Sequence, residues 1–423
     1  MEDKIYSEYC AILAEELQPA MGCTEPIAVA YCAALARKTL GCLPEDVQVY
    51  ASANIIKNVK SVVVPNTGGQ RGLTVAAAAG IVAGDADAKL QVLAGITPEQ
   101  VEEIAAYEKR GIVHVHPSEK DYIFDIQVRV NAAGHTAFAE IAGFHTNVIR
   151  LEQDGAVLLD RPYTEEGPKH ATDRSFLTVE RIVEFADAVK IADVQPVLQR
   201  QIDCNTAIAQ EGLRGDYGAN IGSILLSAYG DGVHNRAKAW AAAGSDGRMN
   251  GCELPVVINS GSGNQGLTAS LPVIVYAQEL GATQEQLYRA LVVSNLVTIH
   301  LKSGIGPLSA YCGATSAGCG AGAGVTYLYG GRFYEIAHTV VNALAINSGM
   351  ICDGAKASCA AKIASAVEAG LLGMQMHGSQ FYGGDGILVK GVENTIRNIS
   401  ELATDGMRET DQTIIKLMIH SCI

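Results

Sequence analysis

The chain has 423 residues, enough for two or three domains, and 48% of them are hydrophobic whereas 18% are charged, as expected of a well-buried globular protein. The formal net charge of −14 and the lack of a long basic run disfavour nucleic acid and anionic membranes as partners. Eleven cysteines, and an N-terminus without a signal-peptide pattern, predict reduced thiols and a cytoplasmic location.

The first hundred residues are predicted to be mostly helical. Apolar residues recur at helical spacing over residues 5–17, and a second apolar run follows at residues 27–40. A capping box with proline in the first turn opens a third helix over residues 97–107. Two short strands are expected between these helices, at residues 47–50 and 61–64.

The pattern changes near residue 111, where strands are expected to dominate. Apolar and polar residues alternate from Tyr122 to Val130, which is typical of a half-buried strand. Further strand-like runs follow at residues 136–141 and 147–151. Gly167-Pro168-Lys169 and the polar residues after it are then predicted to form a linker.

Helices are expected again from residue 178 onward. Residues 179–189 are amphipathic, and Thr283–Gln286 forms another capping box before a helix at residues 287–297. No charged residue occurs between Ser303 and Gly331, where glycine, alanine and serine prevail. So few large aliphatic residues favour a closely packed, buried helix pair that lines a cofactor over a membrane-spanning helix.

These elements predict an α+β fold that is mainly helical, with a smaller β-rich domain in the first half. We expect residues 1–110 to form a helical N-terminal part and residues 111–170 to form a small β-rich domain or insertion. Residues 171–423 are expected to form a helical domain.

Three cysteines in the last third of the chain, Cys312, Cys352 and Cys359, are the strongest candidates for chemistry. They lie in Gly/Ala-rich sequence, and Gly354 favours a loop that brings the close pair to one iron–sulfur cluster. A cluster held by three thiolates keeps one iron open to a substrate, which indicates an enzyme. The alternative is that these cysteines are merely small buried hydrophobic residues. From spacing alone, Cys319 is as good a candidate for the distant cluster ligand as Cys312.

Cys23 is a second candidate, because it lies in the segment Gly-Cys-Thr-Glu-Pro directly before a predicted helix. A helix N-terminus lowers the pKa of a thiol and favours the thiolate, which can act as a base or nucleophile. The alternative is an incidental cysteine in a cap region.

Ser262 and Asn264 are candidates for binding the substrate. Their glycine-containing loop, residues 259–266, offers backbone amides and side chains that suit a carboxylate or phosphate. Residues 66–71 form a similar but shorter loop, in which the Arg71 guanidinium suits a carboxylate. A structural turn is the alternative for each loop.

Together these segments resemble the L-cysteine desulfidases, a family related to the alpha chain of the iron–sulfur L-serine dehydratases. The resemblance spans nearly the whole chain, and its motifs lie at residues 22–26, 215–220, 261–266, 311–314 and 352–359. It implies that Cys312, Cys352 and Cys359, rather than Cys319, hold one [4Fe–4S] cluster. It also places the proton-abstracting residue at Cys23.

The reaction implied by this resemblance is β-elimination of L-cysteine to pyruvate, ammonia and hydrogen sulfide. Its partner is a small amino acid, with Ser262 and Asn264 near the substrate, and a homo-oligomer is possible. The iron–sulfur serine dehydratases carry a Ser-Ser-His-Thr-type segment where this chain has Gly-Cys23-Thr. An L-serine dehydratase of the same class therefore remains an alternative.

Two further alternatives concern the cofactor. The loop with Asn264 also resembles the asparagine loop of pyridoxal-phosphate β-eliminases, for which Lys238 or Lys356 would be the Schiff-base lysine. Cys422, the penultimate residue, is a further candidate to cap the fourth iron of a cluster. The lack of regular strand–helix alternation disfavours the pyridoxal-phosphate fold.

Overall fold

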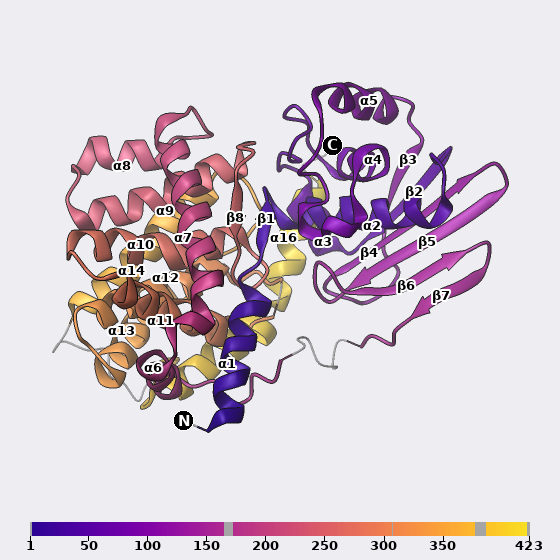
Figure 1. Cartoon of the computed structure of the whole chain (residues 1–423). Coiled ribbons are helices and arrows are strands. Elements are labelled where there is room, and N and C mark those ends of the chain that lie inside the picture. Colours follow the sequence, from indigo (N-terminus) through magenta and orange to yellow (C-terminus); the bar gives the residue numbers. More distant parts are fainter. Residues whose placement is uncertain (1, 165–171, 307, 377–385, 421–423) are drawn as a thin grey trace.

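The computed structural model describes residues 2–164, 172–306, 308–376 and 386–420. Within them the chain forms two parts that lie side by side (Figure 1). One is a six-stranded sheet with helices, here called the sheet part, and the other is a larger group of packed helices, here called the helical part. The predicted α+β fold is therefore confirmed.

The sheet part is built on one mixed sheet in the order β3-β2-β4-β5-β6-β7. β2 pairs parallel to β3 and antiparallel to β4, and the other neighbours are antiparallel. Because β2 precedes residue 111, the sheet extends across the domain boundary predicted there. The strands are β2 (Asp46–Ala51), β3 (Val113–Pro117), β4 (Asp125–Ala132), β5 (His135–Ala142), β6 (Val148–Gln153) and β7 (Ala156–Asp160).

Helices cover one face of this sheet (Figure 1). α2 packs across β4, β5 and β6, and α4 packs beside it. Every second residue of β4, namely Ile126, Val128 and Val130, is fully buried, as the alternating pattern predicts. The helices are α2 (Thr24–Leu40), α3 (Ala53–Val59), α4 (Leu73–Ala83) and α5 (Pro98–Glu108), with a short 3₁₀ helix η1 (Ala86–Gln91).

Most of the predicted elements are present. Both capping boxes form with reciprocal hydrogen bonds, at Thr97 before α5 and at Thr283 before α11. The strand predicted at residues 61–64 is wrong, since that segment makes only an isolated bridge between Val63 and Arg71. Its chain turns back on itself at once, so it has no neighbouring strand to extend. The predicted linker at residues 167–169 lies outside the described residues.

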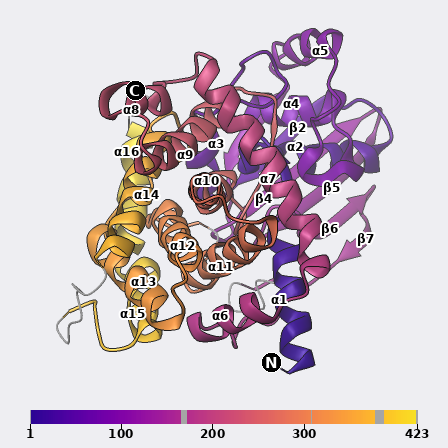
Figure 2. The same cartoon turned by 60° about the vertical axis from the view of Figure 1, so that its left-hand side comes forward.

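The helical part is arranged around α12, which lies among α10, α11, α13 and α14 (Figure 2). Every residue of α12 from Ala314 to Tyr327 is buried. The helices are α6 (Val179–Ala188), α7 (Ile191–Arg214), α8 (Ile221–Tyr229), α9 (Val233–Met249), α10 (Gly263–Glu279), α11 (Gln284–Ser303), α12 (Gly313–Leu328), α13 (Phe333–Asn347), α14 (Cys359–Gln375) and α15 (Val392–Glu401), followed by the π-helical turn η2 (Leu402–Gly406).

Glycines allow α12 and α14 to approach each other closely. A Cβ atom on Gly318 would lie 2.2 Å from the carbonyl oxygen of Ala366, and one on Gly322 would lie 2.4 Å from that of Gly370. Both distances are shorter than any side-chain contact allows. The uncharged stretch at residues 303–331 thus contributes one buried, closely packed helix, α12, whereas its partner α14 lies later in the chain than predicted. No helix in the described residues is long and apolar enough to cross a membrane.

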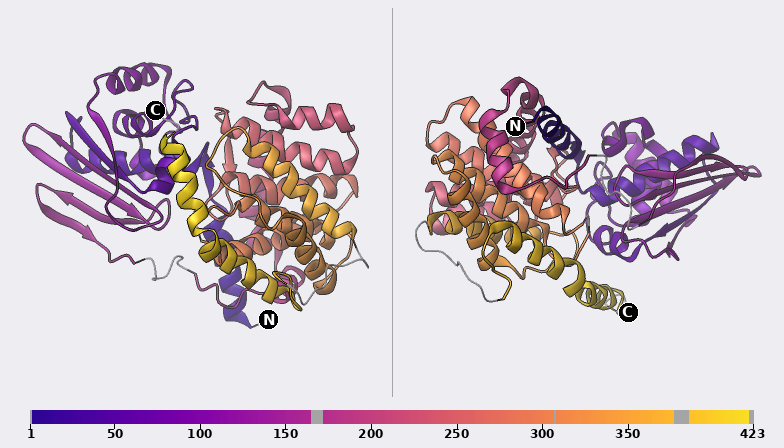
Figure 3. Two further views of the ribbon diagram at one scale, coloured as in Figure 1. Left: turned by 180° about the vertical axis from the view of Figure 1, so that it is seen from behind. Right: turned by 90° about the horizontal axis from the view of Figure 1, so that it is seen from below.

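Three segments tie the two parts together. β1 (Pro19–Met21) pairs antiparallel with β8 (Pro255–Val257), and α1 (Asp3–Glu16) packs on α7 and α11. The last helix, α16 (Arg408–His420), runs back from the helical part to α3 (Figure 3). There Lys57 Nζ lies 2.5 Å from Asp411 Oδ1, with both side chains largely buried.

Candidate active site

Cys312 and Cys352 are brought together by a short antiparallel contact. Tyr311 and Ile351 form an isolated β-bridge, and the backbone amides of the two cysteines donate hydrogen bonds of 3.0 and 2.7 Å across it. Cys312 then caps the N-terminus of α12. This local pairing places two thiols that are distant in sequence at one point of the helical part.

Cys359 reaches the same place through a loop, as predicted from Gly354. Cys352 precedes this loop, and Cys359 is the first residue of α14. Gly354 has φ +94°, and a Cβ atom there would lie 2.8 Å from the carbonyl oxygen of Lys57. Only glycine fits this position without strain, because its backbone is left-handed and lies against another chain segment.

Cys23 caps the N-terminus of α2, as predicted, and is 1% exposed. Its thiol donates a hydrogen bond of 3.1 Å to Glu25 Oε2, which also accepts one from the Thr24 hydroxyl. The Thr24 hydroxyl is also 3.0 Å from the carbonyl oxygen of Gly261. Cys23 belongs to a small apolar cluster against which Cys359 packs, so the two motifs meet.

One cavity of about 100 Å³, here called the thiol cavity, is lined by all the predicted site residues. The helical part contributes its three cysteines and the beginning of α10, whereas α2 of the sheet part contributes its N-terminal cysteine. The sequence therefore predicted residues that the fold gathers into one site: Cys23, Ser262, Asn264, Cys312, Cys352 and Cys359.

Other polar residues line the thiol cavity and were not predicted. Glu25, Gln265 and Tyr311 lie within two residues of a predicted site residue, so the sequence motifs themselves pointed to them. Ser309 and Lys362 lie three residues from Cys312 and Cys359, respectively. The remaining ones come from distant elements and had no signal in the sequence. The set is Glu25, Asn58, Arg248, Gln265, Lys302, Ser309, Tyr311 and Lys362.

The expectation that the helix N-terminus lowers the pKa of Cys23 is wrong in this structure. Burial raises the pKa of this thiol well above its ordinary value, and the Glu25 carboxylate raises it further. The Arg248 guanidinium opposes both effects. Complete removal from water outweighs the helix dipole, which contributes less than desolvation does.

The thiols of the helical part influence one another. A hydrogen bond from Cys312 lowers the pKa of the Cys352 thiol to about 6 and raises that of Cys312. The cations Lys57 and Lys362 also favour the Cys352 thiolate. A thiolate is the form in which cysteine binds iron.

The residues of the thiol cavity fit an iron–sulfur cluster. Three thiols line it, and the buried side-chain oxygens of Asn264, Gln265 and Tyr311 have no hydrogen-bond partner among the described residues. Within the described part of the chain, no three His, Cys, Asp or Glu side chains converge on a single ion. A cluster does not require that convergence, because each thiolate binds a different iron atom.

The competing residues lie elsewhere or outside the description. Cys319 is buried within α12 and does not line the thiol cavity. Lys238 forms an ion pair with Glu368, and Lys356 forms one with Asp353. A Schiff-base lysine would have to line the same cavity as Asn264, and neither of these lysines does. Cys422 lies outside the described residues.

The chain is similar to known proteins over its whole length. The model of the serine dehydratase alpha chain family matches residues 87–416. The chain therefore belongs to the serine dehydratase alpha chain family. It is 54% identical to a UPF0597 protein of Desulfitobacterium hafniense, over 100% of this chain and 98% of the relative. It is 49% identical to one of Lachnoclostridium phytofermentans, over 98% and 100% of the two chains.

Membership of this family identifies the chain as an enzyme of the dehydratase or lyase type and agrees with an iron–sulfur cofactor. The matched residues include the three cysteines of the helical part, whereas Cys23 precedes them. The relatives cover Cys23 as well, because their similarity extends over the N-terminal residues.

Proposed function

We propose that the protein is an L-cysteine desulfidase that eliminates sulfide from L-cysteine with a [4Fe–4S] cluster held by Cys312, Cys352 and Cys359. The observation that carries this proposal is the position of Cys23, whose thiol lines the same cavity as these three thiols but begins a helix of the other part. A proton acceptor and a set of cluster ligands thus face one small space.

The cluster would lie against the three thiolates of the helical part. When bound, a cluster with one iron not held by the protein supplies a Lewis acid for the departing sulfur. Ser262 and Asn264 face the same cavity from the beginning of α10, and the unpartnered Asn264 Oδ1 can accept a hydrogen bond from a substrate in that cavity.

Cys23 would remove the Cα proton of the substrate. A thiol with a raised pKa acts as a base only after it has given up its own proton, and the Glu25 carboxylate is the acceptor within hydrogen-bonding distance. Loss of the Cα proton and of sulfide from Cβ leaves aminoacrylate. This tautomerises to an imine, which water hydrolyses to pyruvate and ammonia.

L-Serine is the second candidate substrate, because the matching family is named for serine dehydratase. The same residues would then expel water instead of sulfide. The ratio of kcat/KM for L-cysteine to that for L-serine distinguishes the two. A ratio above one favours the desulfidase, and a ratio below one favours the dehydratase.

The Cys23→Ala variant tests the proposal directly. General bases typically contribute about 10²–10⁴ to a rate, so pyruvate and sulfide formation by anaerobically reconstituted protein should fall by about that factor. Iron content and the optical spectrum should persist, because no cluster ligand is changed. Cys319→Ala, which removes a buried thiol outside the cavity, is the matched control and should keep its turnover. Near-normal turnover in Cys23→Ala would place the base elsewhere.

A further inference from the structure

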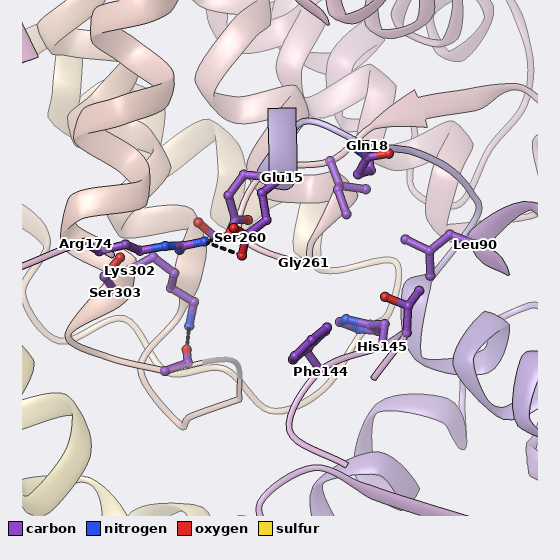
Figure 4. A pocket seen from close by; sticks show the side chains of 14 residues that line it. Glu15, Gln18, Leu90, Phe144, His145, Arg174, Ser260, Gly261, Lys302 and Ser303 are labelled. Carbon is purple, nitrogen blue, oxygen red and sulfur yellow. Dashed lines mark hydrogen bonds and ion pairs between the residues drawn. The ribbon is translucent and has the colours of Figure 1, made fainter. Parts of the chain in front are cut away.

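A second cavity, here called the junction cavity, lies between the two parts and measures about 170 Å³ (Figure 4). Glu16, Arg174, Ser260 and Lys302 line it beside the helical part, and Phe144 and His145 line it from the turn between β5 and β6. It is smaller than a drug-sized pocket, so its ligand must be small.

The junction cavity adjoins the thiol cavity. Lys302, at the end of α11, lines both of them. The turn at residues 259–262 separates them, with Ser260 and Gly261 on the side of the junction cavity and Ser262 on the side of the thiol cavity. A small molecule that bridges the turn would contact both spaces.

Nitrogen atoms with spare hydrogen-bonding capacity line the junction cavity. Figure 4 shows His145 and Lys302 on opposite sides of it. His145 is 7% exposed, and its Nε2 has no hydrogen-bond partner among the described residues; the same is true of Arg174 Nε. Lys302 Nζ donates to the carbonyl oxygen of Gly306 at 2.5 Å, which uses one of its three N–H groups. Buried polar atoms without partners are costly, and a ligand would satisfy them.

The cavity also presents charges of both signs. Arg174 pairs with Glu15 at 3.1 Å and with Glu16, so carboxylates and a guanidinium lie together on one wall. Burial lowers the pKa of Lys302 to about 8, and the neighbouring Cys352, Cys312 and Glu16 oppose this shift. An α-amino acid carries the same two charges a few ångströms apart.

We propose that the junction cavity binds the α-ammonium and α-carboxylate groups of an amino-acid substrate, with the carboxylate on Lys302 and the side chain directed past the turn into the thiol cavity. This inference rests on the proposed function and assigns the residues that hold the substrate. A cluster would take up much of the thiol cavity, so the polar end of the substrate needs the neighbouring space. Ser262 would then contact the middle of the molecule.

Binding of L-alanine tests this assignment without turnover, because L-alanine has both charged groups but no leaving group at Cβ. Its dissociation constant should be measured by calorimetry on the anaerobic holoprotein. Lys302→Met should weaken binding about 10- to 100-fold, the usual effect of losing a hydrogen bond to a charged group. Propionate and ethylamine, which each lack one charged group, should bind at least about tenfold more weakly than L-alanine.

Two further variants sharpen the test. Lys238 lines neither cavity, so Lys238→Met should change L-alanine binding by less than about threefold. Ser303→Phe fills the junction cavity without removing a charge and should weaken binding as Lys302→Met does. Unchanged L-alanine binding in Ser303→Phe would overturn the assignment, as would the absence of L-alanine binding to the wild type.

These binding measurements distinguish failure of the junction-cavity assignment from failure of the proposed function. If L-alanine binding depends on Lys302 but no amino acid is turned over, the binding site stands and the desulfidase proposal fails. If L-cysteine is turned over but L-alanine binding is unchanged in Ser303→Phe, the function stands and the assignment of the junction cavity fails.

Discussion

The sheet part and the helical part are packed in different ways and bring different groups to the site. Large aliphatic side chains alternate through β4 in the sheet part, whereas backbones meet at glycines where α12 packs on α14. The helical part carries the three proposed cluster ligands, and the proposed base is the N-cap residue of α2 in the sheet part. Close backbone packing fixes the thiols that must share one cluster, while the proton acceptor comes from a separate part.

The largest expected effect separates the roles of the two parts. Cys312→Ser should lose its iron under anaerobic reconstitution, because a cluster left with two protein thiolates is weakly held. Cys23→Ala should keep its iron, since Cys23 belongs to the sheet part and is not a proposed ligand. Iron and acid-labile sulfide are the measurements.

Cys319→Ser is the control for this comparison, because it changes a buried thiol on the same helix, α12. It should retain iron in proportion to folded protein. Loss of iron from Cys319→Ser together with its retention in Cys312→Ser would reverse the ligand assignment.

A smaller effect tests the packing of the helical part. Gly322→Ala places a Cβ atom 2.4 Å from the carbonyl oxygen of Gly370, so the helices must separate. Overpacking against rigid backbone should lower the free energy of unfolding by about 3 kcal/mol, measured by urea denaturation. Gly349→Ala is the control, since that glycine has nothing within 4 Å of the new atom. Equal stability of the two variants would show that α12 and α14 can move apart at little cost in free energy.

The smallest expected effect comes from the sheet part. Val128→Ala removes two methyl groups from a fully buried position of β4 and should cost about 2 kcal/mol in urea denaturation. Val157→Ala makes the same chemical change on β7, where the side chain is 50% exposed, and should cost less than about 0.5 kcal/mol. Should Val128→Ala cost more than Gly322→Ala, the contrast between the two kinds of packing would be wrong.

Local patterns in the sequence predicted the elements well, because their causes are local. The capping boxes at Thr97 and Thr283 and the alternation in β4 each depend on neighbouring residues. The position of β2 between β3 and β4 depends on pairing over long distances in the sequence. The sheet therefore could not be delimited from the strand pattern that starts near residue 111.

The candidate site was predictable where its residues lie in motifs. The junction cavity was not, because Glu16, His145, Arg174 and Lys302 come from four separate segments without a shared pattern. The pKa of Cys23 could not be predicted either. Its helix N-terminus was visible in the sequence, but its burial and its contact with Glu25 depend on the folded environment.

The pairing of β1 with β8 has a consequence for synthesis on the ribosome. Pro19–Met21 cannot find its partner until residues 255–257 have left the ribosome, and α1 must wait for α7 and α11. At about 5–20 residues per second, this delay is on the order of tens of seconds. α7 is complete before β8 but α11 follows it, so the apolar face of α1, with Tyr9, Ile12 and Leu13, is only partly covered during that time. Part of the apolar surface of the nascent N-terminus therefore stays exposed until the helical part is complete.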